Sequence, residues 1–395
     1  MSDSRSNHGG IAAWLVALVI LVGVLVPVGA WAWLTLFDYK DASGISASHE
    51  AIGDQAYSAG DFREAITAYE QAASVKNSFA IQVKLAGVRI GLLGLHPDML
   101  DQRQFPRIEH ERRWLMEQDP ASIPTCIAVR GHMEMIEGKL KQAEASYNES
   151  LKKNADNVAA HMGLALLDKQ KGDDDEAAGE FETVLAAVPD HYEALVALSE
   201  IRINNGKPEK ALELLKKAVK TNNTWRPHYL MGVAYEKSKK DEKAEKEFKQ
   251  AIQLNPKSFV TYAALGNLYF KAKMYAQAKS AFSGALQLRN DEGIAAGLAS
   301  SLKELSRPAE CLKTLKPYIG SSEIGPGTLL VAGQCSADLK QTGQARALYS
   351  AVIAQVAKLG DKLPKDVGEA LNQAARKSLA ELEGESKAGS KGRSR

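Results

Sequence analysis

Small residues recur along most of the chain at intervals of 33 or 34 positions, with one longer interval of 44. Twelve positions after most of them comes a second small residue, and four positions later a large one. A period of this length fits a helix–turn–helix unit that is stacked many times, and it predicts an all-helical solenoid. The first small residues are Gly53, Gly87, Gly131, Ala165, Ser199, Gly232, Gly266, Ala299 and Gly333; the second are Ala65, Ala143, Ala177, Ala211, Ala244, Ala278, Cys311 and Ala345; the large ones are Tyr69, Tyr147, Phe181, Leu215, Phe248, Phe282, Leu315 and Tyr349.

One unit, residues 260–290, shows why this spacing is helical. Four residues of its first half fall at offsets of 3, 4 and 7, which places them on one face of a helix, and the second half has a matching face. Because Gly266 and Ala278 lack bulk, the two helices can cross closely while large side chains fill the space around the crossing. One hairpin leaves an apolar face exposed, so neighbouring units must stack on it. The two faces consist of Tyr262, Leu265, Gly266 and Tyr269, and of Ala278, Phe282 and Ala285.

The pattern resembles the tetratricopeptide repeat family, whose units read W-x2-L-G-x2-Y, A-x3-F and P. Here one unit reads Tyr262-x2-Leu265-Gly266-x2-Tyr269, Ala278-x3-Phe282 and Asn290, and the unit before it reads His228-x2-Met231-Gly232-x2-Tyr235, Ala244-x3-Phe248 and Pro256. Seven positions after the first small residue come Gly60, Gly94, Gly138, Gly172 and Gly206, which suit a tight turn between two helices. The resemblance covers about residues 46–359 and implies a right-handed α-solenoid of about nine repeats.

Two segments depart from the repeat. Residues 96–123 form an insertion, which we interpret either as a lengthened second helix with Trp114 and Leu115 packed on its neighbours, or as a protruding element that docks a partner. Residues 364–383 are amphipathic and are predicted to form a helix that caps the last repeat. Residues 384–395 are basic, small and polar, which predicts disorder.

The N-terminal part carries a long apolar segment. Residues 11–37, from Ile11 to Phe37, contain no charge, and a helix of about 20 apolar residues crosses a hydrocarbon layer of about 30 Å. The segment predicts a retained single-pass membrane anchor behind a short polar tail, residues 1–10; a cleaved secretion signal ending at Ala30-Trp31-Ala32 is the alternative. We expect the anchor in a bacterial inner membrane with the solenoid in the periplasm. A solenoid on the cytoplasmic face is the alternative, because few Lys and Arg residues flank the segment.

Composition limits the classes of partner. A formal net charge of +2 over 395 residues gives no general attraction to nucleic acid. The lysines of residues 207–249 alternate with glutamates at helical spacings, which predicts a solvated face; a contact with anionic lipid or an acidic partner is the alternative. Cys126, Cys311 and Cys335 form no C-x-x-C pair, so packed free thiols are expected, with a disulfide between Cys311 and Cys335 as the alternative.

No arrangement of residues predicts catalysis. His49-Glu50 begins like a zinc-binding helix, but Gly53 stands where the second histidine ligand would be. Phosphate-binding loops, nucleophile elbows and dinucleotide-binding turns are missing from the sequence. We therefore expect no catalytic residue, metal site, cofactor or small-molecule substrate, and we keep an enzyme with an unrecognised site as one alternative.

The inward-facing positions of the first helices are the candidate binding residues. By the family resemblance, such positions line a concave groove that takes an extended or helical peptide. Adaptors of this family that bind chaperone tails need a Lys/Asn/Arg clamp; only Asn267 matches it, and Ala263 stands where a lysine is required. The predicted partner-binding groove consists of Met162, Leu166, Val196, Glu200, Arg226, Tyr229, Val233, Asn267 and Phe270.

These features together predict a non-catalytic, membrane-anchored scaffold that holds partner proteins. The chain resembles N-terminally anchored bacterial tetratricopeptide proteins of the cell envelope, which implies a role in assembling or stabilising an envelope complex. A permanent structural subunit of a larger membrane machine is the main alternative.

Overall fold

Every regular element that the computed structural model describes is a helix; it describes residues 44–57, 62–76, 78–95, 124–321 and 324–392. The predicted all-α class is thereby confirmed for these residues. A first helix covers residues 44–57. The later elements are α2 (Phe62–Val75), α3 (Phe79–Leu95), α5 (Pro124–Ile136), α6 (Leu140–Lys153), α7 (Val158–Lys171), α8 (Asp174–Ala187), α9 (Tyr192–Asn204), α10 (Pro208–Thr221), α11 (Trp225–Lys237), α12 (Asp241–Leu254), α13 (Phe259–Lys271), α14 (Tyr275–Leu288), α15 (Glu292–Glu304), α16 (Pro308–Leu315), α17 (Pro326–Asp338), α18 (Thr342–Leu359), the short 3-10 helix η4 (Gly360–Lys362) and α19 (Lys365–Gly392).

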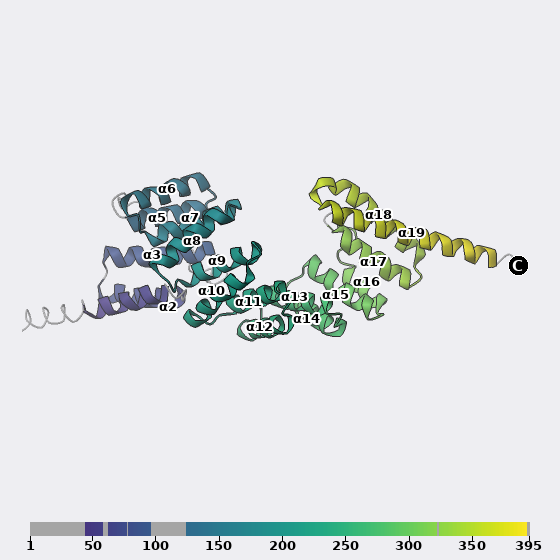
Figure 1. Cartoon of the computed structure of the whole chain (residues 1–395), viewed down its shortest axis with the longest axis horizontal. Helices are drawn as coiled ribbons and strands as arrows, with labels where there is room; N and C mark the ends of the chain where they lie inside the picture. Colours follow the sequence, from purple (N-terminus) through teal and green to yellow (C-terminus); the bar gives the residue numbers. More distant parts are fainter. Residues whose placement is uncertain (1–43, 58–61, 77, 96–123, 322–323, 393–395) are drawn as a thin grey trace, which may run out of the picture. The chain divides into compact units, whose positions relative to one another are not determined.

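The chain forms two compact units, unit 1 up to Leu198 and unit 2 from Ser199 onward. In unit 1, α2 packs on α3, α5 on α6 and α7 on α8, and the first helices α5 and α7 also contact each other (Figure 1). This is a stack of helical hairpins, as the repeat predicts.

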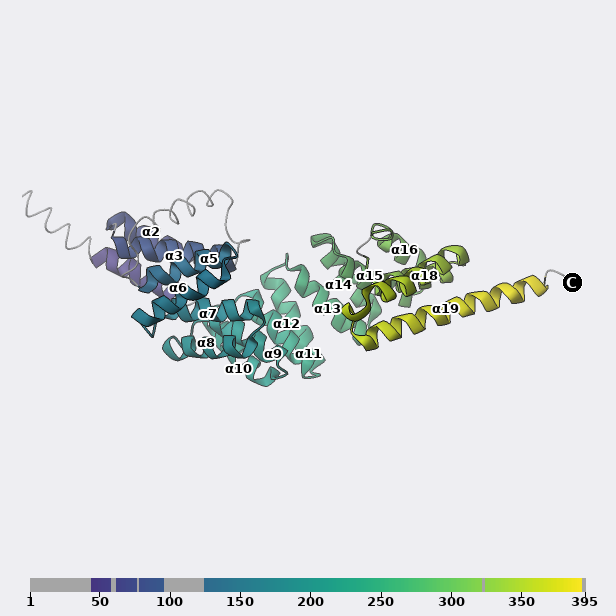
Figure 2. The same ribbon diagram turned by 90° about the horizontal axis from the view of Figure 1, so that it is seen from above.

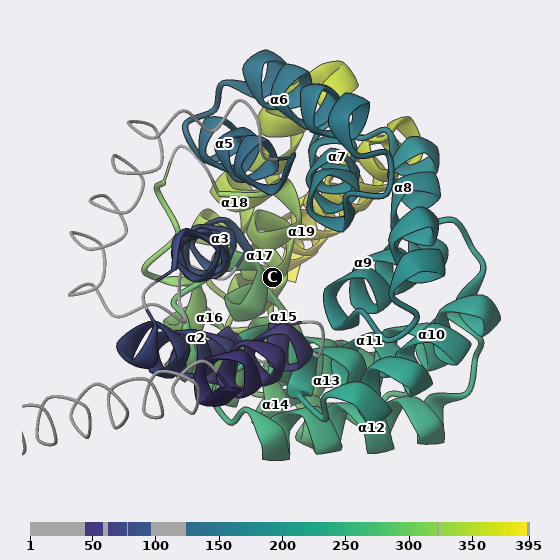
Figure 3. The same cartoon turned by 90° about the vertical axis from the view of Figure 1, so that its left-hand side faces the viewer.

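Unit 2 repeats the arrangement with the pairs α11/α12, α13/α14, α15/α16 and α17/α18. Consecutive first helices contact each other, and Figure 3 shows α11 and α13 on the inner side of α12 and α14. The long helix α19 packs on α17 and α18 through Leu371, Ala375, Leu379 and Leu382, and Figure 2 shows it beside α18. The segment that was predicted to cap the last repeat is part of this helix.

The recurring small residues are explained by the rings that lie on them. A Cβ atom added at Gly266 would lie 2.9 Å from the ring of Phe282, and one added at Gly297, in the next repeat, would lie 2.7 Å from the same ring. Tyr147 is held between Gly131 and Gly163 in the same way. Real Cβ atoms do not approach a ring this closely, so each aromatic ring fills a slot that only glycine leaves open.

The turn between the two helices of a repeat requires a left-handed residue. Gly138, Gly172 and Gly206 adopt positive φ at this position, as expected. The corresponding residues of the later repeats are not glycine, yet they adopt the same conformation with φ of 55° to 61°: Lys239, Lys273, Ser306 and Lys340. Gly94 does not form such a turn, because α3 continues to Leu95.

The expectations for the chain ends need correction. Residues 1–43, including the predicted anchor from Ile11 to Phe37, and the insertion at 96–123 lie outside the described residues. Among the helices that are described, none combines the length and the apolar character needed to cross a bilayer. This finding contradicts the predicted single-pass membrane localisation with a periplasmic solenoid.

The C-terminal segment is also more helical than its composition predicts. Disorder was expected for residues 384–395, but α19 continues to Gly392. Extending an existing helix costs less than starting one, so the helix continues from the capping segment although Gly384 and Gly389 are poor helix formers.

Candidate functional site

The predicted groove residues of unit 1 do not form an open surface. Met162 on α7 is 5% exposed and Val196 on α9 is fully buried, whereas Leu166 on α7 is half-buried. Met162 and Val196 are thus core residues, and their assignment to a binding groove is not supported by their burial.

The start of α9 takes part in a long-range contact that the repeat pattern does not contain. The ring of Tyr57, at the end of the helix at residues 44–57, meets the ring of His191 edge to face with 6.3 Å between the centroids. His191 is the residue before α9, so this contact brings the first described helix of unit 1 against the start of α9. Burial raises the pKa of the Tyr57 hydroxyl, and the nearby Glu193 carboxylate raises it further.

The predicted residues of unit 2 are more accessible. Arg226, Tyr229 and Val233 are half-buried on α11, and on the neighbouring α13 Phe270 is half-buried and Asn267 is exposed. We call these five residues the α11–α13 surface. Glu200, on the part of α9 that belongs to unit 2, is also half-buried.

Aromatic rings give the α11–α13 surface its character. Tyr229 lies 6.2 Å from Trp225 and 6.1 Å from Phe248, measured between ring centroids. Phe270 meets Tyr275 edge to face at 5.4 Å. Tyr229 is therefore packed on the repeat core through Phe248 and stays half-buried on the surface of α11.

Carboxylates surround the aromatic part of this surface. Burial raises the pKa of the Tyr229 hydroxyl, and the carboxylates of Glu200 and Glu236 raise it further. Glu236 at the end of α11 pairs with Lys271 at the end of α13, with 2.5 Å between Oε1 and Nζ. The ion pair joins the two helices beside Phe270, and because Lys271 is exposed it contributes little to stability.

A polar pocket of about 670 Å3 lies farther along the first helices of unit 2. We call it the C-terminal pocket. It is formed by the ends of α15 and α17 and by α19, and its lining includes Lys303, Glu304, Gln334, Asp338, Ser378 and Glu381. Lys303 occupies in α15 the repeat position that Glu236 occupies in α11, so the pocket continues the inward face of the repeat.

Two histidines connect the helices within single repeats. The Nδ1 atom of His161 on α7 lies 2.6 Å from the Glu180 carboxylate on α8, and His228 on α11 has the same relation to Glu247 on α12. These histidines stand where the family has an aromatic residue, and they have a structural role. Within the helices that are described, no group of three His, Cys, Asp or Glu residues is placed to hold a metal ion.

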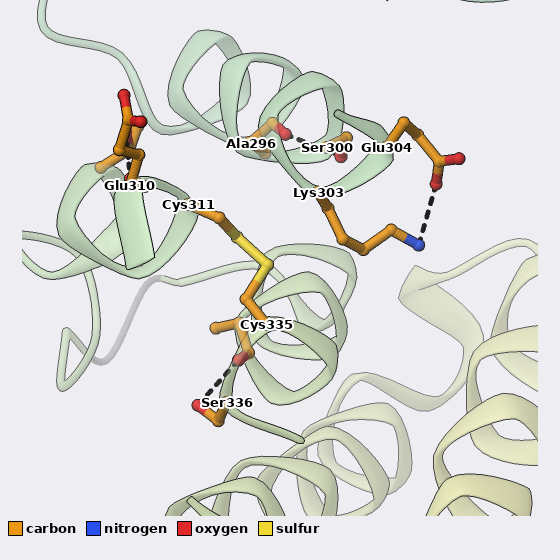
Figure 4. Close-up of a disulfide and its surroundings, with 10 residues drawn as sticks. Ala296, Ser300, Lys303, Glu304, Glu310, Cys311, Cys335 and Ser336 are labelled. Carbon is orange, nitrogen blue, oxygen red and sulfur yellow. Dashed lines mark hydrogen bonds and ion pairs between the residues drawn. A yellow bond between two sulfur atoms is a disulfide. The ribbon is translucent and has the colours of Figure 1, made fainter. Parts of the chain in front are cut away.

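Cys311 on α16 and Cys335 on α17 form a disulfide, with 6.4 Å between their Cα atoms (Figure 4). Both residues are fully buried. The expectation of free thiols is therefore wrong for this pair, and the alternative holds. A spacing signal existed: Ala244 and Leu268, in neighbouring repeats, are also 24 positions apart and lie in the same buried core.

Comparisons with known proteins agree with the geometry. Family models of the tetratricopeptide repeat match residues 137–191, 170–234, 225–258 and 260–292. Tetratricopeptide repeat protein 6 of Homo sapiens is 25% identical over 177 residues, which are 44% of this chain and 34% of that protein. A TPR repeat-containing protein of Methanocaldococcus jannaschii is 25% identical over 163 residues, 39% of this chain and 29% of that protein. The matches thus span about a third of the length of these relatives.

One solved structure shows the same fold. The chain is similar to one in the crystal structure of the APC/C hetero-tetramer Cut9-Hcn1, with a TM-score of 0.53 and 17% identity over 71% of this chain and 52% of that one. A tetratricopeptide repeat protein from Parabacteroides merdae has a TM-score of 0.49 and 17% identity, covering 63% of this chain and 97% of that chain. The chain contains tetratricopeptide repeats, which are suited to protein–protein interaction and are generally non-catalytic.

Proposed function

We propose that this chain is a non-catalytic scaffold that assembles partner proteins by holding a segment of one partner on the α11–α13 surface. The observation that carries the proposal is the contrast between the two units. Val196 of unit 1 is fully buried, whereas Tyr229 and Phe270 of unit 2 keep part of their side chains exposed. Exposed aromatic side chains on a rigid helical support are frequent centres of binding energy.

We expect the partner segment to carry apolar side chains and to have backbone N–H and C=O groups that are available for hydrogen bonds. Tyr229, Val233 and Phe270 offer aromatic and aliphatic area for apolar side chains. The exposed amide of Asn267 both donates and accepts, so it can hydrogen-bond the backbone of an extended peptide. An extended or partly helical segment of this kind fits the face between two first helices.

Affinity capture from cell extract, with identification by mass spectrometry, tests the proposal. Asn267→Arg places a long charged side chain in the middle of the α11–α13 surface without removing core contacts, and Lys246→Glu changes an exposed residue of α12 as the control. We expect the first variant to weaken binding of the main partner by at least about tenfold, because blocking a binding hot spot costs about 2 kcal/mol or more.

The control variant is expected to bind normally, and both variants are expected to melt like the wild-type protein. Loss of the partner in Lys246→Glu with full retention in Asn267→Arg would place binding on the second helices and contradict the proposal. A partner captured in a fixed ratio to the chain would indicate a permanent subunit instead of an assembly scaffold.

A further inference from the structure

The disulfide lies at an unusual junction between two repeats. α16 has only eight residues, whereas α12 and α14 have 14 each. The connection from α16 to α17 runs from Lys316 to Gly325, whereas three residues join α14 to α15 and four join α12 to α13. Residues of this connection, Tyr318, Ile319 and Ile324, pack on the core and take the place of the missing helical turns.

Cys311 and Cys335 replace an apolar contact of the repeat core. Cys311 occupies the small position of the second helix, which is alanine in the other repeats that have it. Cys335 lies two positions after the first small residue of its repeat, where α13 has Leu268. The covalent bond thus stands where the neighbouring junction relies on packing alone.

A second connection holds α17 at its other end, against α15 instead of α16. The Glu292 carboxylate, at the start of α15, accepts hydrogen bonds from the Gly325 backbone N–H at 2.8 Å and from the Thr328 hydroxyl at 2.5 Å. Both donors lie at the start of α17. The starts of α15 and α17 are therefore joined by hydrogen bonds, whereas the disulfide is near the end of α17.

The disulfide adjoins the C-terminal pocket. Gln334, the residue before Cys335, lines this pocket, and so does Asp338 one turn later. Lys303 and Glu304 line it from α15, and Figure 4 shows Lys303 on the helix next to the disulfide. If the bond opens, the hydrogen bonds of Glu292 remain as a hinge, and the pocket end of α17 is the end that can move away from α15.

We propose that Cys311 and Cys335 are a redox-modification site that controls the shape of the C-terminal pocket. The oxidised pair holds the pocket end of α17 against the start of α16, which follows the end of α15, and the reduced pair lets that end of α17 move away. Since the pocket continues the inward face of the first helices, the proposal rests on the proposed function for its role in partner binding. The conformational change itself does not depend on that function.

The chemistry requires a dithiol reductant. Its thiolate attacks one of the two sulfur atoms, the S–S bond breaks, and the other cysteine leaves as a thiolate that takes up a proton. The second thiol of the reductant then resolves the mixed disulfide, so two electrons pass to the protein and the reductant becomes a disulfide. Both cysteines are fully buried, so the reductant gains access only when the α16–α17 junction opens.

Hydrogen exchange read by mass spectrometry tests this control on the full chain, without any partner. Dithiothreitol is the reductant, and alkylation with mass counting shows whether two new thiols have formed. We expect reduction to raise exchange at least about tenfold in the second half of α17 and in α19. Exchange in α11 and α13 should stay unchanged. Equal exchange in α17 and α19 of the oxidised and reduced protein would overturn the proposal.

A matched variant separates the bond from the packing. Cys311→Ala with Cys335→Leu reproduces the Ala244 and Leu268 arrangement of the neighbouring junction, and Cys311→Ala with Cys335→Ala serves if leucine does not fit. The variant is expected to show no response to dithiothreitol. A response of the same size in the variant would show that another group senses the reductant, and the proposal would fail. Partner binding by Asn267→Arg is measured in a separate experiment. The proposed function and the redox proposal can therefore fail independently of each other.

Discussion

The rings of Tyr57 and His191 meet edge to face although they belong to helices far apart in the sequence. His191 is also the cap of α9, because its Nδ1 atom accepts a hydrogen bond from the Ala194 backbone N–H at 3.4 Å. The His191 side chain therefore contacts the first described helix of unit 1 and also caps the start of α9. Its Nε2 atom is buried without a hydrogen-bond partner, so this site disfavours the protonated, charged form of the His191 ring.

This site makes a prediction about pH. Burial lowers the pKa of His191 below its ordinary value of 6.5. Because the unfolded chain then binds more protons than the folded one, stability should be fully present above pH 6.5 and fall as the pH decreases below it. Urea unfolding from pH 7.5 to 5.5 measures this change. His191→Asn keeps a capping side chain but cannot titrate, so its stability should depend less on pH. An unchanged slope in that variant would contradict the assignment to His191.

The slot between Gly266 and Phe282 predicts a destabilising methyl group. Gly266→Ala puts a Cβ atom 2.9 Å from the ring, and moving the ring in a tight core costs about 1 to 3 kcal/mol. This cost exceeds the gain of up to about 1 kcal/mol that alanine brings to a helix interior. Gly179→Ala on α8 is the control, because no atom lies within 4 Å of its added Cβ. Urea unfolding followed by circular dichroism should show opposite signs for the two variants.

The left-handed lysines predict a stabilising substitution. Lys273 adopts φ of 60°, a conformation that costs a residue with a Cβ atom about 1 kcal/mol relative to glycine. Lys273→Gly should therefore raise the free energy of unfolding by about 0.5 to 1 kcal/mol. The reverse change, Gly206→Lys in the corresponding turn, should lower it by a similar amount. Thermal melting of the pair gives the test, and a loss of stability in Lys273→Gly would refute the strain argument.

The local part of the fold could be predicted from the sequence, because each repeat carries its own spacing. Gly266 and Phe282 are 16 positions apart, and the helical period alone places them on facing surfaces. The sequence did not decide between a disulfide and two free thiols, for a related reason. The spacing of Cys311 and Cys335 is compatible with a bond, but it is also the spacing of an ordinary packed pair.

The exposure of the predicted groove residues could be predicted only in part. Met162 and Val196 stand at the same repeat positions as Tyr229. The sequence therefore predicts the same groove-facing position for all three residues, yet Met162 and Val196 are buried. Unit 1 also contains the contact of Tyr57 with His191, and no local pattern encodes a contact between residues so distant in the chain. The N-terminal apolar segment similarly supported a membrane prediction that the described helices do not bear out.

The aromatic rings that lie between two glycines affect where the chain can be truncated. Phe282 on α14 is covered on one side by Gly266 of its own repeat and on the other by Gly297 on α15, which belongs to the next. A fragment that ends after α14 leaves half of that ring in water, whereas one that ends after α15 keeps it enclosed. The enclosed ring thus needs three helices, α13, α14 and α15, which begin and end on a first helix, so this slot does not coincide with a repeat read from the sequence.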